Sequence, residues 1–266
     1  MRRLFHPSTD RRTAPQWSVE EIAEEYAYPP LGEGSGGADA WLRGNMVASL
    51  DGAIHHQGRS QPLSCKADMR IFGVLRALAD VVVVGAQTVR QEGYRPAKRR
   101  SGFADRRAAL GQAPVPAIAV VSAGLELDFT QPLFTEPVVP TLLLTGRGAP
   151  EDRVAEARRA GAEVVFVGEG AAVDPVRVPA ALAARGLRRQ LTEGGPKLLG
   201  EFAVAGVLDE LCVSIAPRIV AGPAPRIMNG PLLPDPDEFT LEGVLEEGGF
   251  LFTRYRRART GTDRAE

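Results

Sequence analysis

Short runs of apolar residues recur through the middle of the chain, separated by segments with helical periodicity. The apolar runs are typical of strands buried on both faces, and they span residues 81–84, 117–121, 141–144, 163–167 and 211–215. Helices are predicted at residues 66–79, 151–160, 175–184 and 196–204, the first from the spacing of Met69, Phe72, Leu75 and Leu78. Buried strands that alternate with helices predict a mainly parallel sheet covered by helices.

The segments on either side of this region have a different pattern. Residues 43–50 alternate loosely and end at Asp51 and Gly52, which predicts a strand followed by a turn. Residues 239–246 and 250–257 flank a pair of glycines, which predicts an antiparallel hairpin at the C-terminus. We therefore expect one α/β domain with a mixed, mostly parallel sheet over residues 41–258.

Residues 1–40 are predicted to form an extension to this domain. Residues 17–28 favour a short amphipathic helix with Ser18 as its N-cap, and a glycine-rich linker follows at 31–37. Trp17, Ile22 and Tyr26 would pack this helix onto the main domain or onto a partner subunit. Residues 259–266 are polar, and we expect a flexible tail there.

Composition narrows the possible partners and compartments. Among 266 residues the formal net charge is −1, so the basic excess of a nucleic-acid-binding domain is missing. Neither a membrane-spanning run nor a secretory signal is evident, and we expect a cytoplasmic protein. The two cysteines, Cys65 and Cys212, are expected to be small buried thiols.

The strongest local signal for chemistry is the sequence Thr-Glu-Gly-Gly-Pro at residues 192–196, between a predicted strand and a helix. A helix start exposes unpaired N–H groups, and glycines let a diphosphate approach the backbone. Pro196 suits the first helical position and Lys197 adds a positive charge. On this motif alone, a tight turn without a ligand is an equally good interpretation.

Two further turns are predicted at the same edge of the sheet. Residues 83–89 place Gly85 and Thr88 after a strand, leading into a polar loop, and Asp51 follows another strand. Ligands of open α/β sheets collect at the carboxyl ends of strands. Neither of the two glycine turns, at residues 83–89 and 192–196, fits the usual dinucleotide or P-loop fingerprint. Asp-Gly is also a common plain turn, and His55 with His56 lacks a third ligand, so no metal site is expected.

Short motifs follow one another in a definite order along the domain. They begin with Asn-Met-Val-Ala-Ser-Leu-Asp-Gly at 45–52, then Ser60, residues 63–64, a helix ending at 75–77, and residues 80–85 and 88–89. They close with residues 192–196, 207–211 and 215–217. This succession, over roughly residues 41–257, resembles the pyrimidine reductase domain of riboflavin biosynthesis.

The resemblance implies a dihydrofolate-reductase-like fold, usually dimeric, and a small-molecule substrate. The implied reaction is the NADPH-dependent reduction of 5-amino-6-(5-phosphoribosylamino)uracil to its ribitylamino product, with a hydride added at C1 of the ring-opened sugar. Two alternatives stay open: reduction of a related heterocycle such as dihydrofolate, and a nucleotide-binding protein without turnover. Retention of Asp51 and Glu193 argues against the second.

The resemblance also implies roles for individual residues. Asp51, which would orient the substrate or help proton delivery, and Glu193 are the expected catalytic residues. The expected substrate-binding set is Ser60, Arg76, Arg95 and Glu193, in which the arginines suit a phosphate group. The expected cofactor-binding set is Ala48, Gly85, Thr88, Ser122, Arg147, Gly194, Gly195, Pro196, Lys197, Leu198 and Leu199. Arg147 is assigned to the 2′-phosphate of NADPH from its charge and its place after a strand.

The chain also departs from the family pattern near the expected substrate. Pro62 stands where the bifunctional enzymes carry tryptophan, and Glu-Gly-Tyr-Arg-Pro at 92–96 replaces an Asp-Asp-Pro segment. We therefore expect the substrate pocket to differ from that of the bifunctional enzymes more than the cofactor site does.

Overall fold

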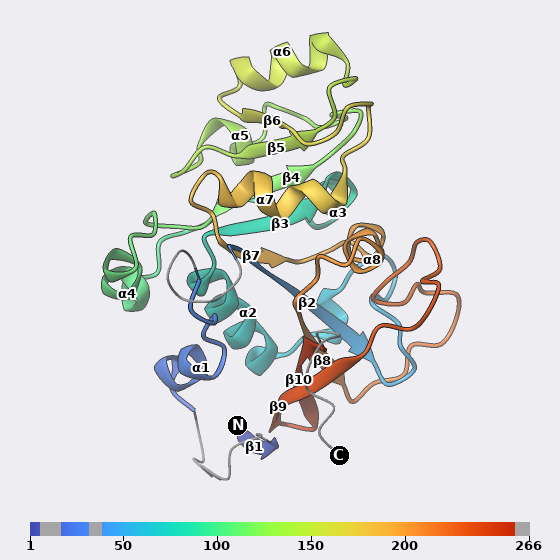
Figure 1. The fold of residues 1–266 in the computed structure, drawn as a ribbon. Coiled ribbons are helices and arrows are strands. Elements are labelled where there is room, and N and C mark those ends of the chain that lie inside the picture. The colour runs from blue at the N-terminus through green and yellow to red at the C-terminus, as the bar shows by residue number, and fades with distance from the viewer. Residues whose placement is uncertain (6–16, 32–38, 259–266) are drawn as a thin grey trace.

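The strands of the molecule form a single mixed sheet. The computed structural model describes residues 1–5, 17–31 and 39–258, and its ten strands lie in the order β1-β9-β10-β8-β2-β7-β3-β4-β5-β6 (Figure 1). Their bounds are β1 (Arg2–Phe5), β2 (Trp41–Ser49), β3 (Val81–Gly85), β4 (Ala117–Val121), β5 (Leu142–Thr145), β6 (Glu163–Phe166), β7 (Arg189–Thr192), β8 (Glu210–Ala216), β9 (Phe239–Glu247) and β10 (Phe250–Arg257).

Strand direction is uniform over one part of this sheet and alternates over the other. From β8 through β6 the neighbouring strands are parallel, whereas β10 pairs antiparallel with β8 and β9, and β1 pairs antiparallel with β9. The predicted mixed sheet with its C-terminal hairpin is confirmed. Because β7 lies between β2 and β3, the carboxyl ends of these three strands and of β4 meet at one edge.

Helices cover both faces of the sheet. They are α1 (Val19–Glu25), α2 (Lys66–Leu78), α3 (Ala86–Glu92), α4 (Ala104–Ala109), α5 (Pro132–Thr135), α6 (Glu151–Arg159), α7 (Val178–Ala183) and α8 (Pro196–Val204). The prediction of a polar loop after Gly85 is wrong, because α3 begins directly at Ala86. It ends at Glu92 and is capped by Gly93, which has the left-handed φ of 62°. Its residues are mostly polar, so the segment lacks the apolar periodicity that predicts a helix.

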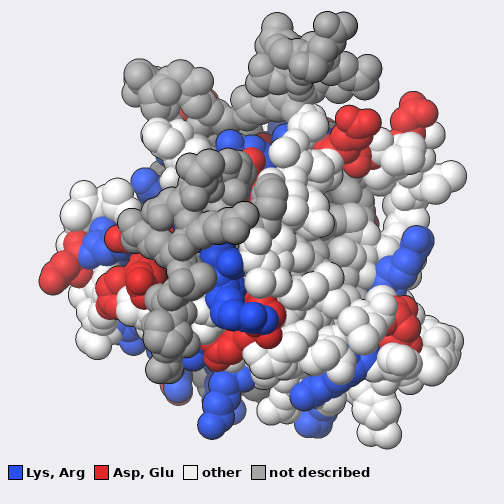
Figure 2. Space-filling view, turned by 90° about the horizontal axis from the view of Figure 1, so that it is seen from below, with Lys and Arg blue, Asp and Glu red and all other residues white. Residues whose placement is uncertain are grey.

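The N-terminal segment belongs to the folded body. Ser18 forms a capping box with Glu21 at the start of α1, as predicted for the cap. Trp17, Ile22 and Tyr26 are buried in the same core cluster as α2, so the helix packs onto the main domain. Apart from Leu31, the predicted glycine-rich linker lies outside the described residues, as does the polar tail. Figure 2 views this end from below, where positive and negative side chains are intermixed on the visible face.

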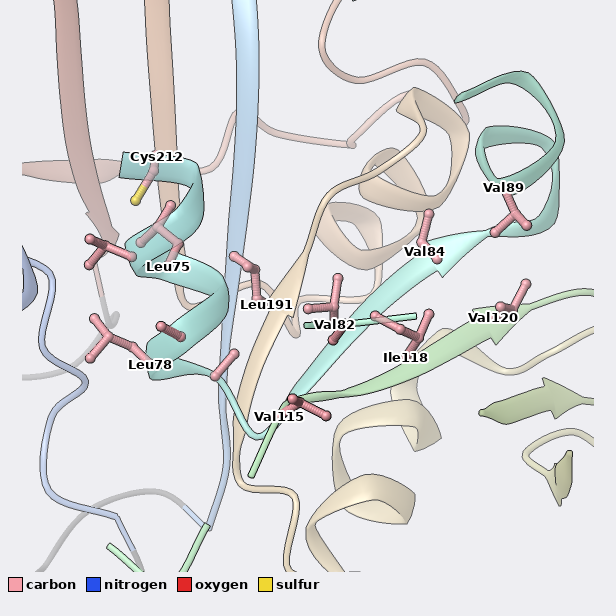
Figure 3. Close-up of a cluster of buried hydrophobic side chains, with 14 of the residues drawn as sticks. Leu75, Leu78, Val82, Val84, Val89, Val115, Ile118, Val120, Leu191 and Cys212 are labelled. Atoms are coloured by element: carbon pink, nitrogen blue, oxygen red, sulfur yellow. The ribbon is translucent and has the colours of Figure 1, made fainter. Parts of the chain in front are cut away.

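Two hydrophobic cores lie on opposite faces of the parallel strands. Val82 and Val84 of β3 point into one core, with Leu75 and Leu78 of α2 (Figure 3). The intervening β3 residues point into the other core with α7 and α8, as predicted for a strand buried on both faces. On α2, however, Ile71 and Val74 are buried and Met69 is 54% exposed. The predicted helix is confirmed, but Met69, one of the residues whose spacing predicted it, lies mostly exposed.

The described helices include none that is long and apolar enough to cross a membrane. Of the two cysteines, Cys212 is buried as expected, but Cys65 is only half-buried. Cys65 is the N-cap of α2, where its Sγ accepts a hydrogen bond from the backbone N–H of Asp68 at 3.4 Å. The expectation of a buried thiol is therefore wrong for Cys65. A helix N-cap lies at the end of the helix, where the side chain is partly exposed to solvent.

Candidate active site

A large cleft lies at the edge where the carboxyl ends of β2, β3, β4 and β7 meet. Its volume is about 1390 Å³, which exceeds the roughly 300–1,000 Å³ typical of a pocket for one drug-sized ligand. Residues of β2, α2, α3, the loop after β4 and the start of α8 form its wall. The cleft therefore has room for two ligands side by side.

One wall of the cleft is built from the two glycine turns that the sequence singled out. The backbone N–H of Glu193 donates to Val83 O at 3.2 Å, and the N–H of Gly85 donates to Gly194 O at 2.9 Å. Gly194 has a φ of +84°, and a Cβ atom on Gly195 would lie 2.8 Å from Thr88 Oγ1. The turn at residues 193–195 thus depends on glycine, for its backbone conformation at Gly194 and for its close approach to Thr88 at Gly195.

The N-terminal end of α8, which carries the positive end of the helix dipole, forms part of this wall. Gly195 is the N-cap residue, no side chain caps the helix, and Pro196 occupies its first turn. Gly195, Pro196, Lys197 and Leu198 all line the cleft. Uncapped N–H groups, a helix dipole and a lysine fit the diphosphate of a dinucleotide.

The other residues expected to bind the cofactor fall into two groups. Gly85, Thr88 and Ser122 line the cleft. The remainder are not among its lining residues: Ala48, Arg147, Gly194 and Leu199. Ala48 and Leu199 are buried behind the wall, while Arg147 is largely exposed, with Nε 3.5 Å from Glu169 Oε2. The roles of all these residues stay predictions.

Glu193 lies at the centre of a cluster formed with Arg76 and Tyr94. Arg76 Nε and Nη2 donate to the two carboxylate oxygens of Glu193, both at 2.6 Å, and the hydroxyl of Tyr94 also donates to Oε2. The guanidinium lies 4.4 Å from the centre of the Phe72 ring. Three side chains from α2, the loop after α3 and the loop after β7 are thereby held together.

Burial and charge in this cluster fix the protonation of Tyr94 and Arg76. Burial, reinforced by the Glu193 carboxylate, raises the pKa of Tyr94 well above its usual range. Burial disfavours the charged form of Arg76, but the neighbouring carboxylate prevails and raises the pKa of the guanidinium. Tyr94 therefore stays a hydroxyl donor and Arg76 a cation at neutral pH. Two of the four predicted substrate-binding residues, Arg76 and Glu193, are therefore in direct contact.

Asp51 occupies the turn after β2 and binds another loop. Its carboxylate accepts hydrogen bonds from Ser49 Oγ at 2.5 Å and from the backbone N–H groups of Val220 and Ala221, the latter at 2.6 Å. These hydrogen bonds, that from Ser49 first, lower the pKa of Asp51 to about 2. Asp51 is not among the residues that line the cleft, and so acidic a carboxyl group is a poor proton donor at neutral pH.

The two remaining substrate predictions lie on either side of Glu92. Ser60 lines the cleft and its Oγ donates to Glu92 Oε1 at 3.2 Å. Arg95 lines a smaller pocket of about 410 Å³, which shares Phe72, Glu92 and Tyr94 with the cleft. This basic pocket also contains the cationic side chains of Arg76, Lys98, Arg100 and Arg107.

Sequence reasoning missed two groups in the site, Tyr94 and Asp68. Tyr94 falls in the segment where the chain departs from the family pattern, and that departure was the available signal. Asp68 lines the cleft from the first turn of α2. An acidic residue at the start of a helix is normally explained by capping and the helix dipole, so the sequence alone could not mark it.

Comparison with known proteins places this arrangement in a family. Residues 40–246 match the family model described as the RibD C-terminal domain. The chain belongs to this family. A protein of Archaeoglobus fulgidus named 2,5-diamino-6-ribosylamino-4(3H)-pyrimidinone 5′-phosphate reductase is 31% identical over 191 residues, 70% of this chain and 84% of that protein. Its namesake from Methanothermobacter thermautotrophicus is 33% identical over 178 residues, 67% and 78% of the two chains.

Solved structures agree with the RibD C-terminal domain assignment. A pyrimidine reductase-like protein from Corynebacterium diphtheriae superposes with a TM-score of 0.73 at 27% identity, covering 83% of this chain and 92% of that one. A deaminase/reductase from Thermotoga maritima shares the fold, with a TM-score of 0.61 at 15% identity and coverage of 82% and 57%. The chain is a reductase of riboflavin biosynthesis, and reductases of this family typically use NAD(P)H.

Proposed function

We propose that this reductase uses NADPH to reduce the ribosylamino group of a phosphorylated aminopyrimidine. The substrate is 5-amino-6-(5-phosphoribosylamino)uracil, as the sequence suggested, or the 2,5-diamino-pyrimidinone phosphate in the names of its relatives. Both carry the same reacting group. The observation that carries the proposal is one cleft lined both by the uncapped start of α8 and by Glu193, whose carboxylate is held by Arg76 of the adjoining pocket.

The chemistry requires a hydride and a proton. Bound NADPH would supply the hydride to C1 of the ring-opened sugar imine, and the imine nitrogen gains a proton, so that one NADPH and one proton are consumed. The protein has to orient the substrate and keep water from the reacting carbon. We assign the diphosphate to the start of α8, with Gly85, Thr88 and Ser122 along the same wall and Arg147 as the candidate for the 2′-phosphate.

The substrate would lie toward α2. Glu193, held by Arg76 and Tyr94, would accept hydrogen bonds from the hydroxyl groups of the sugar. The basic pocket with Arg95, Lys98 and Arg100 adjoins this cluster and suits the phosphate. Asp51 is assigned to positioning rather than to proton transfer, because hydrogen bonds hold its carboxylate in the ionised form.

NADPH oxidation measured with each of the two aminopyrimidine phosphates, and separately with dihydrofolate, tests this proposal. We expect turnover with at least one aminopyrimidine, a preference for NADPH over NADH, and little turnover of dihydrofolate. Glu193→Gln should lower kcat by at least about tenfold, since an amide replaces the carboxylate at the reacting end, while NADPH affinity changes little. Tight NADPH binding without any turnover would favour a nucleotide-binding protein.

The expected homodimer is part of the same proposal. Light scattering on the purified chain should give twice the mass of 28.4 kDa. A monomeric mass at assay concentrations, with full activity, would remove the dimer from the proposal without affecting the reaction.

A further inference from the structure

We propose that Asp68 accepts hydrogen bonds from the edge of the pyrimidine ring and thereby selects a ring that carries an amino group at C2. This inference rests on the proposed function, and it decides between the two substrates named above in favour of the 2,5-diamino-pyrimidinone. Asp68 is a carboxylate to which the proposed reductase mechanism assigns no role.

Asp68 is a nearly buried carboxylate in the wall of the cleft. It occupies the first turn of α2 and is 8% exposed. Its Oδ1 accepts a hydrogen bond from Ser214 Oγ of β8 at 2.6 Å, and Oδ2 accepts one from Ser64 Oγ at 2.5 Å. Two hydroxyl groups from different elements therefore hold the carboxylate in one orientation.

The hydrogen-bonding capacity of this carboxylate is only partly used. An ionised carboxylate offers about four acceptor sites, and each oxygen of Asp68 receives one side-chain hydrogen bond. Within the described part of the chain, no Lys or Arg forms an ion pair with Asp68, whereas Arg76 engages both oxygens of Glu193. A buried carboxylate without a cation is costly unless further donors reach it. Asp68 is thus suited to accept two N–H groups from a ligand.

The position of Asp68 on α2 aligns it with the remaining substrate-binding groups. Asp68, Phe72 and Arg76 follow one another at intervals of four residues, so they lie on one face of the helix. Eight residues of helix span about 12 Å, comparable to an extended ribosylaminopyrimidine phosphate. A ring whose edge meets Asp68 would lie along Phe72, with its sugar near Arg76 and Glu193 and its phosphate near the basic pocket.

The two candidate substrates differ at this edge of the ring. In the 2,5-diamino-pyrimidinone, the N3–H and the C2 amino group are adjacent donors, which match the two oxygens of a carboxylate. In the uracil, N3–H lies between two carbonyl oxygens, so one carboxylate oxygen would face a carbonyl oxygen. Unpaired polar groups buried in this way reject the wrong substrate by as much as about 10⁴-fold.

Exchange of one carboxylate oxygen for an amide tests the inference. Asp68→Asn keeps the size of the side chain but presents one acceptor and one donor, which match the N3–H and C2 carbonyl of the uracil. We expect the wild type to prefer the diamino substrate in kcat/KM by about 100-fold or more. The variant should lose most of that preference, mainly through KM for the diamino substrate. Asp152→Asn, in the exposed first turn of α6, is the matched control and should leave the ratio unchanged.

Other outcomes separate this inference from the proposed function. Equal loss of turnover on both substrates, or a wild-type preference for the uracil, would overturn it. If the wild type reduces neither compound, the proposed function fails, and the inference is then decided by calorimetry with the free bases. The wild type should bind 2,5,6-triamino-4-pyrimidinone more tightly than 5,6-diaminouracil when NADPH is present, and equal affinities would overturn it. This wild-type comparison also applies if Asp68→Asn does not fold.

Discussion

Asp51 links two loops through one ionised side chain, and this linkage makes a pH-dependent contribution to stability. Its folded-state pKa of about 2 lies below the ordinary value of 3.8, because Ser49 and two backbone N–H groups donate to the carboxylate. The contribution is therefore fully present above about pH 4 and is lost as the pH falls toward 2. The difference in Tm between wild type and Asp51→Asn should be constant above pH 4 and narrow below it. A difference that is independent of pH would contradict this assignment.

The pair formed by Arg76 and Glu193 is expected to contribute to stability as well as to the site. The side chain of Glu193 is 4% exposed, so Arg76→Met would leave a buried carboxylate without its cation. We expect a loss of about 3 kcal/mol in the free energy of unfolding, measured in urea. Adding Glu193→Gln to Arg76→Met should restore more than half of the loss, because the buried charge is then removed as well.

A matched control is available at the surface. Arg177 and Glu169 also form a close ion pair, at 2.8 Å, but both side chains are more than half exposed. Arg177→Met should change the free energy of unfolding much less than Arg76→Met, since water solvates the remaining charge. Equal effects of the two substitutions would mean that Arg76 acts through packing on Phe72 and not through its charge.

The sequence indicated some site residues and could not indicate others. Gly195 and Thr88 were found because glycine turns at strand ends have a local signature, and Glu193 because it lies within one of them. Tyr94 and Asp68 have no such signature. A tyrosine in a loop and an acid at a helix start are common, and only their contacts with Glu193 and with Ser214 mark them.

At the scale of elements, the start of α8 packs closely against the start of α3 at Gly195. A Cβ atom there would lie 2.8 Å from Thr88 Oγ1, so Gly195→Ala should push the two helix starts apart. We expect the dissociation constant for NADPH to rise about tenfold, equivalent to about 1.4 kcal/mol, as measured by calorimetry. Gly102→Ala, whose Cβ would have no atom within 4 Å, is the matched control and should bind NADPH normally.

A second substitution distinguishes a clash from a general loss of flexibility. The clash should also make Gly195→Ala less stable to urea. Because Thr88→Ala removes the nearest atom, the double variant should recover part of that stability. If the double variant is no more stable than Gly195→Ala alone, the close contact with Thr88 is not the cause of the defect.

Helices and strands, like site residues, could be predicted only where the local sequence has a distinctive pattern. Strands β3, β4 and β8 and helices α2 and α8 were found because each has a long or continuous apolar pattern. Helix α3 was missed because it is short and polar, and β1 because its four residues gain their order from pairing with β9. The position of β7 between β2 and β3 also depends on pairing of distant segments, which no local pattern encodes.

At the scale of the whole molecule, residues 17–31 complete the interior around the central strand β2. Arg43 of β2 is fully buried and forms an ion pair with Glu210. Its guanidinium also donates to the backbone carbonyl of Tyr26 at 2.7 Å and lies 4.1 Å from the centre of the Tyr28 ring. The N-terminal segment thus supplies a hydrogen-bond acceptor and an aromatic ring to a buried cation. The sequence analysis, which predicted an extension to the domain, did not anticipate this role.

Removal of this segment should therefore destabilise the reductase domain. Without residues 1–38, Arg43 would lose part of its hydrogen bonding, and the face of α2 that packs against α1 would be exposed to water. A milder test is Ile22→Ala, which should cost about 3 kcal/mol because Ile22 is fully buried, whereas Glu20→Ala on the exposed side should be nearly neutral. Urea unfolding of the three variants measures these effects. A truncated chain as stable as the full one would show instead that residues 39–258 fold and pack without the segment.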